Sequence, residues 1–315
     1  MGYFRQKRPL QKMKMVDYIK LHLKDIDIER LGNLPYLEFI RGVSERTGEL
    51  LDKKEAHYHC CKITVYDTGT IVFSGSLHKL YNSLKNLNPL NFNNSKGFNG
   101  NQFTLKDLFV VKTHLMNLFD CKPDQMQIKS IEIGINTEPE FDPALFIKGL
   151  LFHKNKMFEY RFNGNFARVR HQHFDLKIYN KSLQYLMKTF TLRFELKFNK
   201  MLEMKSIGFH TIEDINQKNL MEAFALLLKR FSEVVYYDKT ICNLGLKKPQ
   251  IKSLYRYSNP RYWIDELKPN HRHRHKENLN QIILGNSQNL HRKLRTEMIK
   301  KCSIITQLSE SDNVA

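Results

Sequence analysis

The chain has 315 residues, a formal net charge of +19 and an isoelectric point near 9.6. Its content of 41% hydrophobic and 11% aromatic residues is that of a folded protein and excludes a disordered tail. The positive surplus is spread along the chain. It therefore favours a polyanionic partner, most often nucleic acid, over a generally basic ribosomal or membrane-surface protein.

The cysteine content and the N-terminal segment bear on where the protein works. Five cysteines without a C-x-x-C pair argue against a zinc knuckle or a disulfide framework, so we expect reduced thiols. No apolar run approaches the length of a membrane span, so we expect no membrane partner. Residues 1–14 are basic and lack the apolar core of a signal peptide. We expect a loose basic arm there and a cytoplasmic protein, in the cytoplasm of a bacterial host if a phage encodes it.

The first half of the chain predicts a hairpin and two helices. Strand-forming residues flank Asp67-Thr68-Gly69, which predicts a β-hairpin over 60–74. A helix is expected over 76–87, followed by an Asn-rich loop over 86–101. That loop is either a lid or DNA contact or, more commonly, a plain surface excursion. Thr104 with Asp107 at the reciprocal capping position opens a further helix.

The middle of the chain predicts strands mixed with helices. Asp142 followed by Pro143 is typical of a helix start and predicts a helix over 143–154. Apolar spacing predicts an amphipathic helix over 219–235. Four strands are expected, at 128–136, 157–162 (ending in an Asn163-Gly164 turn), 173–180 and 191–198.

These elements predict an α+β fold, with a mixed or antiparallel sheet and helices packed on one face. We expect a catalytic domain over 15–240. The part after residue 240 holds 14 Lys and Arg against 6 Asp and Glu. We therefore expect 241–315 to be a basic, mainly helical region that adds contacts to the DNA backbone.

Three of the strands share one design, with an apolar face and a charged face. In the first, Ile131, Ile133 and Ile135 alternate with polar residues, and the other two alternate in the same way. If the three strands share a sheet, their apolar faces turn to one core and their polar faces converge. That surface would hold Glu132, Glu195, Tyr179, Lys177 and Lys181.

This combination suits tyrosine attack on a phosphodiester. A free tyrosine has a pKa of about 10 and is a poor nucleophile at neutral pH, so neighbouring lysines would help to stabilise the phenolate. Two carboxylates can hold Mg²⁺ or Mn²⁺, which prefer hard oxygen ligands. The products would be a 5′-phosphotyrosine and a free 3′-hydroxyl. Taken singly, each residue has an ordinary structural reading: a packed tyrosine, surface ion pairs or a solvated lysine face.

The chain resembles the rolling-circle replication initiators of filamentous phages and, more distantly, the related plasmid initiators. The resemblance covers roughly residues 60–215 and rests on the order and spacing of four blocks. The blocks are Phe73–Leu80 with Gly100–Asp107, Ile128–Asn136, His173–Gln184, and Leu192–Lys197 followed by Lys205–Gly208.

The resemblance implies a nicking-endonuclease fold and a DNA nicking and rejoining enzyme whose tyrosine is at Tyr179. Lys181 matches a lysine that commonly follows the tyrosine, and Glu195 matches the carboxylate of an Arg-Phe-Glu motif. Glu132 falls where the family usually has aspartate. Gln184 lies where the family often has a glutamate, so we assign it no role in metal binding.

Histidines offer further metal candidates. His173 matches a histidine of some family members, but six residues separate it from Tyr179, about 20 Å along an extended strand. His57 and His59 form a rival pair, because His-hydrophobic-His on a strand is how many nicking enzymes hold their ion.

Basic residues near these blocks and in the tail are candidate DNA contacts. The tail carries the run Asn270–Lys276, where a DNA-facing role is favoured over adventitious metal binding. The expected DNA-binding residues are Lys79, Lys96, Arg193, Lys197, Arg272 and Arg274.

The leading functional hypothesis is a phage or plasmid replication initiator. It would nick one strand at an origin, single-stranded or in a hairpin, and later rejoin it, working with a host helicase and polymerase. The alternative from another class is a non-enzymatic origin- or single-strand-binding protein. A relaxase or transposase with the same chemistry is the third possibility.

Overall fold

The computed structural model describes residues 16–89 and 97–312, with side chains up to residue 302. The fold is α+β, as predicted. Its contacts divide the chain into two units, Met1–Gly134 with Lys197–Phe224, and Ile135–Leu196 with Ala225–Ala315. The predicted arm at 1–14 lies outside the described residues.

One sheet of ten strands has the order β2-β3-β4-β5-β1-β6-β12-β11-β10-β9. The pairings whose register is described are antiparallel. The division between the two units falls inside β6 and β12, which pass unbroken from one unit to the other. The strands are β1 (Val16–Leu23), β2 (Ile40–Val43), β3 (Leu50–Tyr58), β4 (Cys61–Tyr66), β5 (Ile71–Ser76), β6 (Met126–Thr137), β9 (Glu159–Arg161), β10 (Phe166–Arg170), β11 (Phe174–Asn180) and β12 (Leu192–Phe198).

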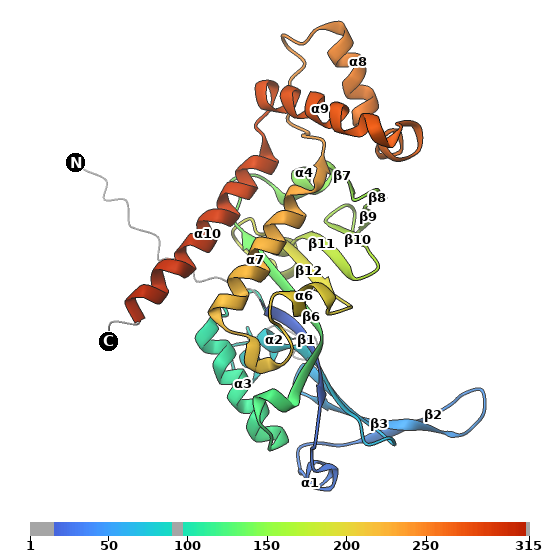
Figure 1. Cartoon of the computed structure of the whole chain (residues 1–315), viewed down its shortest axis with the longest axis vertical. Helices are drawn as coiled ribbons and strands as arrows, with labels where there is room; N and C mark the ends of the chain where they lie inside the picture. Colours follow the sequence, from blue (N-terminus) through green and yellow to red (C-terminus); the bar gives the residue numbers. More distant parts are fainter. Residues whose placement is uncertain (1–15, 90–96, 313–315) are drawn as a thin grey trace. The chain divides into compact units, whose positions relative to one another are not determined.

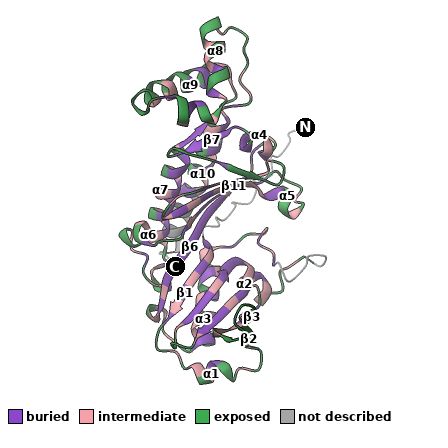
Figure 2. Ribbon diagram, turned by 90° about the vertical axis from the view of Figure 1, so that its right-hand side faces the viewer, coloured by how far each residue is buried: buried purple, intermediate pink, exposed green. Residues whose placement is uncertain are grey.

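In the first unit, helices pack on the sheet through an apolar core. The predicted hairpin is present as β4 and β5, and the predicted helix at 76–87 is α2 (Leu77–Leu84). The helix α3 (Leu105–Phe119) begins with the predicted capping box of Thr104 and Asp107. Short helices α1 (Ile28–Gly32) and α6 (Leu202–Ser206) complete the unit, together with the turns η1 (Pro123–Gln125) and η2 (Ile212–Asp214). Figure 2 shows that the strands beside α2 and α3 are largely buried.

The second unit corrects the predicted helix over 143–154. The helix α4 (Pro143–Ile147) starts at Asp142 as expected, but it stops before Gly149. The Gly149 carbonyl instead accepts from the Tyr237 N–H at 2.8 Å, and a Cβ at Gly149 would lie 2.3 Å from the Tyr237 carbonyl oxygen, so only glycine fits where the chain enters the next strand. The buried residues that follow form β7 (Leu150–His153), which pairs with β8 (Lys156–Met157) and β13 (Val234–Tyr236) in a second, three-stranded sheet.

The predicted strand over 157–162 is split in a similar way between β8 and β9, and the amphipathic helix predicted over 219–235 is α7 (Gln217–Ser232). The predicted helix ran three residues too far, because the chain after Ser232 turns into β13 and pairs with β7. Its expected apolar stripe is buried.

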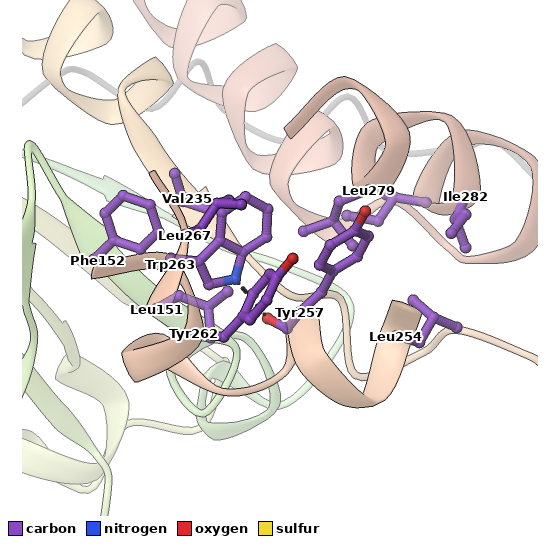
Figure 3. Close-up of a cluster of buried hydrophobic side chains, with 11 residues drawn as sticks. Leu151, Phe152, Val235, Leu254, Tyr257, Tyr262, Trp263, Leu267, Leu279 and Ile282 are labelled. Carbon is purple, nitrogen blue, oxygen red and sulfur yellow. Dashed lines mark hydrogen bonds between the residues drawn. The ribbon is translucent and has the colours of Figure 1, made fainter. Parts of the chain in front are cut away.

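The C-terminal part is helical, as predicted. It contains α8 (Lys248–Tyr257), η3 (Tyr262–Glu266), η4 (Pro269–His271), α9 (Arg272–Asn286) and α10 (Leu290–Asp312), drawn in orange and red in Figure 1. Trp263 is fully buried in a cluster with Phe152, Tyr257 and Tyr262, and its indole N–H donates to the Tyr257 carbonyl (Figure 3). Within the described part of the chain, no helix combines the length and the apolarity needed to cross a membrane.

Candidate active site on β11 and β12

Tyr179 stands near the end of β11 on its polar face. Phe174, Leu176 and Ile178 are buried on the opposite face, as their alternation predicts. The Tyr179 hydroxyl donates a hydrogen bond to Glu195 Oε1 at 2.9 Å, across to the neighbouring strand β12. The structure thus brings together two of the predicted site residues.

Glu195 is a buried carboxylate, 2% exposed, with cationic groups on two sides. The Arg193 guanidinium donates to Oε1 through Nε, and the Lys177 ammonium lies 3.7 Å from Oε2. Buried carboxylates are stable only when charged or hydrogen-bonding partners replace water. Lys177 and Glu195 therefore lie together around the tyrosine, as the strand pattern predicts.

Arg193 is enclosed. Its side chain is 2% exposed, and besides Glu195 it donates to Asn136 Oδ1 at 2.9 Å from Nη1. A guanidinium fixed in this way is not presented to a DNA backbone, so the surface contact predicted for Arg193 is replaced by a role in holding Glu195. Its alternation with apolar residues predicted an outward face, but β12 is buried on both faces.

The strand ends at Asn180, as predicted, so Lys181 is not part of it. Lys181 is the first residue of the short helix α5 (Lys181–Tyr185), and its side chain is fully buried instead of extending the polar face of β11. Its Nζ lies 5.6 Å from the centre of the Tyr185 ring. Asn180 caps this helix by accepting from the Leu183 N–H, which is why the backbone turns there.

Asp17 on β1 is a further buried carboxylate, in the first unit. One of its oxygens accepts from the Ser76 hydroxyl, and the other accepts from Asn99 Nδ2 at 2.7 Å. Its neighbour Tyr18 interacts electrostatically with Glu132. Burial raises the pKa of Tyr18, a hydrogen bond with Ser74 opposes that rise, and the Glu132 charge adds to it.

Asp17, Glu132 and Glu195 lie on β1, β6 and β12, which are consecutive strands of the sheet. One carboxylate oxygen of each lies within 4.8 Å of the others, and all three side chains are buried. In the described residues, no other group of three or more His, Cys, Asp or Glu side chains gathers in this way. A set of carboxylate oxygens suits Mg²⁺ or Mn²⁺, so the cluster can hold a divalent cation.

The predicted histidine ligands are not part of this cluster. His173 precedes β11, at the end opposite Tyr179. The strand β3 ends at Tyr58, and His59 lies in the following turn with a φ of 51°, where its Nδ1 bonds the Ser83 hydroxyl at 2.7 Å. His57 and His59 therefore do not share one strand face, which the metal-pair hypothesis requires.

The other predicted DNA contacts fall in several places. Lys79 on α2 is half-buried, and the Lys197 ammonium lies 4.3 Å above the centre of the Tyr18 ring. Arg272 is engaged with Asn155 Oδ1 at 2.6 Å and with a backbone carbonyl, whereas Arg274 is exposed. Lys96 lies outside the described residues.

Sequence reasoning missed Asp17. The alternation from Ile19 to Leu23 was a signal for β1, but the residues before it do not keep the same period. A register shift between Val16 and Ile19 interrupts the pairing with β6. A bulge of this kind redirects side chains, and no residue pattern in the sequence indicates it.

Comparisons with known proteins establish neither a family nor an activity for this chain. No protein-family model and no curated protein sequence matches the chain. A solved structure of a rolling circle replication initiator protein from Geobacillus stearothermophilus is similar, with a TM-score of 0.38 and 11% sequence identity. The similarity covers 75% of this chain and 89% of that chain. Values this low do not establish a shared activity.

Proposed function

We propose that the chain is a DNA strand transferase that initiates rolling-circle replication, with Tyr179 as its nucleophile. The observation that carries the proposal is the hydrogen bond from the Tyr179 hydroxyl to the buried Glu195, with Lys177 beside the same carboxylate. A tyrosine needs an adjacent base or a cation to attack at neutral pH, and this site offers both.

In the proposed reaction the Tyr179 oxygen attacks a backbone phosphorus while Glu195 takes the phenolic proton. The bond between phosphorus and the 3′-oxygen breaks, and that oxygen leaves as a hydroxyl after gaining a proton. The new bond is a phosphotyrosine ester to the 5′ end of the fragment downstream of the cut. Because one ester replaces another, the reverse reaction can reseal the strand.

Lys177 would steady the negative charge that develops on the phenolic oxygen and the phosphate. Arg193 would keep Glu195 oriented toward Tyr179 and is a positioning residue. A Mg²⁺ or Mn²⁺ ion held by Asp17, Glu132 and Glu195 would polarise the scissile phosphate. The free 3′-hydroxyl would then serve a host polymerase, with a host helicase opening the duplex ahead.

The test uses a pool of single-stranded oligonucleotides of randomised sequence, incubated with the full chain and Mn²⁺. A label at the 3′ end should migrate with the protein on a denaturing gel, and a label at the 5′ end should appear on a released fragment. Tyr179→Phe should abolish the adduct, whereas Tyr185→Phe, which alters the next tyrosine in the chain, should retain it. An adduct formed by Tyr179→Phe would disprove the assigned nucleophile.

The competing function is DNA binding without chemistry. It predicts metal-independent binding and no covalent product from the wild-type chain. It also predicts that Glu132→Ala and Glu195→Ala leave binding intact or strengthen it slightly, because each removes a negative charge.

A further inference from the structure

Phe162 is an exposed aromatic residue in an unusual backbone conformation. It lies in the turn between β9 and β10, with 75% of its surface exposed. Its φ is 51°, and Asn163 and Gly164 continue with positive φ values of 52° and 82°. A bulky residue rarely adopts this conformation, and such outliers cluster at functional positions.

The turn aligns three aromatic rings that end at Tyr179. The ring centres of Phe162 and Phe166 are 6.1 Å apart, and those of Phe166 and Tyr179 are 5.8 Å apart. Phe166 pairs directly with Tyr179 across β10 and β11, so both rings lie on the polar face of the sheet. We call Phe162, Phe166 and Tyr179 the aromatic row.

Cationic side chains flank the aromatic row on the same face. Arg161 is paired with Phe166 across β9 and β10, and Arg168 is paired with Lys177 across β10 and β11. Arg170 follows at the next position of this face. Glu159 is an acidic residue in this group, 3.3 Å from Arg168 and 3.9 Å from Arg170. The face therefore combines aromatic rings with a surplus of positive charge.

The turn is attached to the end of the strand that carries Tyr179. The Asn180 N–H donates to the Asn165 carbonyl at 2.9 Å, and the Asn180 side chain donates to Asn165 Oδ1 at 3.2 Å. Asn165 Nδ2 in turn donates to the Phe162 carbonyl at 3.2 Å. The Phe162 backbone is thereby tied through Asn165 to the end of the strand that carries the tyrosine.

We infer that the aromatic row is a stacking subsite for an unpaired nucleotide base next to the phosphate that Tyr179 attacks. Aromatic rings interleaved with cations are how proteins hold single-stranded nucleic acid, because each base offers a flat face and each nucleotide a negative charge. In a duplex those faces are stacked on one another and are not available to Phe162. The inference rests on the proposed function and specifies its substrate as a single strand.

The experiment measures equilibrium binding of a fluorescein-labelled oligothymidylate and of a labelled duplex, by fluorescence anisotropy without metal. Every protein carries Tyr179→Phe, which keeps the ring of the row and removes the hydroxyl. Phe162→Ala should weaken oligothymidylate binding by about 5- to 100-fold, and it should leave duplex binding within about twofold. Phe162→Trp should bind as tightly as the parent, and Phe162→Leu should bind as weakly as Phe162→Ala.

Phe109→Ala is the matched control, because this α3 phenylalanine is 45% exposed and belongs to the first unit, whereas the aromatic row belongs to the second. It should bind like the parent. Far-UV circular dichroism verifies that each variant is folded. Parent-like binding by Phe162→Ala, or equal binding by Phe162→Leu and Phe162→Trp, would overturn the inference.

These outcomes are separable from those of the adduct test. If the wild-type chain forms the adduct and Phe162→Ala binds oligothymidylate like the parent, the proposed function stands and the stacking subsite is disproved. If no adduct forms but oligothymidylate binding depends on Phe162, the nicking function is disproved and the aromatic row remains a surface that stacks single-stranded bases.

Discussion

Tyr179 and Glu195 are joined across adjacent strands by a hydrogen bond of 2.9 Å, and the carboxylate that accepts it is buried between Arg193 and Lys177. This arrangement gives the tyrosine a proton acceptor before any substrate arrives. It also ties the geometry of the site to a buried ion pair, so reactivity and stability are linked at one side chain.

Glu195→Gln should slow adduct formation strongly. Glutamine keeps the size and can still accept the tyrosine hydrogen bond, but it is not a base, and general-base catalysis typically contributes about 10²- to 10⁴-fold. The rate is measured in single-turnover gel assays with a 3′-labelled oligonucleotide. A rate within about twofold of wild type would show that Glu195 takes no proton.

Arg193→Ala should destabilise the fold by about 3–5 kcal/mol, because it leaves Glu195 buried without its guanidinium partner. Urea unfolding followed by circular dichroism gives the free energy of unfolding. The double variant Arg193→Met with Glu195→Leu should recover most of the loss, since an apolar pair needs no compensating charge. If the double variant is as unstable as Arg193→Ala, the loss comes from packing and not from the unpaired carboxylate.

Asp17→Asn and Glu132→Gln should each weaken Mn²⁺ binding by about 10-fold or more, since each replaces a charged oxygen ligand. Titration calorimetry on the full chain measures the affinity. Asp67→Asn is the control. This exposed carboxylate lies in the turn after β4, pairs with Arg41 on β2, and is not part of the cluster of Asp17, Glu132 and Glu195. Unchanged affinity in both cluster variants would place the ion elsewhere.

Acid should destabilise the second unit through two histidines, His153 and His291. Burial lowers the pKa of His153 and of His291 to about 4, from the ordinary value of 6.5. Between pH 6.5 and 4 the unfolded chain therefore binds more protons, so the free energy of unfolding falls as the pH falls. The slope should reach about 1.4 kcal/mol per pH unit for each histidine.

Urea unfolding across that pH window tests the slope. His291→Phe should flatten it, because phenylalanine does not titrate and can keep the stacking on Phe231, whose ring centre lies 4.3 Å from that of His291. A slope that is the same in His291→Phe as in wild type would rule out His291 as a source of acid sensitivity.

Trp263→Ala should cost about 3–5 kcal/mol of stability, since it opens a cavity in the cluster shown in Figure 3. Trp263→Phe should cost less, because it fills part of that space. Thermal unfolding followed by circular dichroism measures both. Equal losses would point to the lost hydrogen bond to the Tyr257 carbonyl, which both variants remove.

Much of the sheet was predictable because its strands alternate cleanly. Glu132 on β6, Tyr179 on β11 and Glu195 on β12 were assigned to polar faces from period two alone. The capping box at Thr104 is equally local, since all its partners lie within one helical turn. Patterns of this kind depend on near neighbours in sequence.

The missed features depend on partners distant in sequence. Asp17 contacts its partners Ser76 and Asn99 only in the folded protein. The bulge next to it in β1 has no recognisable pattern in the sequence of that segment. The helix α4 gives way to β7, whose partner β13 and the bond from the Tyr237 N–H to the Gly149 carbonyl come from a distant part of the chain. Arg193 looked like a surface cation because its buried acceptor, Asn136, comes from another strand.

Hydrogen bonds between amides and hydroxyls hold Asn180 and Ser182 at the end of β11. Asn180 bonds Asn165 and accepts from Ser182, and Ser182 in turn accepts from the Thr191 N–H. Amides and hydroxyls of this kind keep their protons over the whole working range of an enzyme. The pH dependence of the nicking rate above pH 6.5 would then report the ionisation of the reacting groups themselves. It would not include a change in the hydrogen bonds around Asn180.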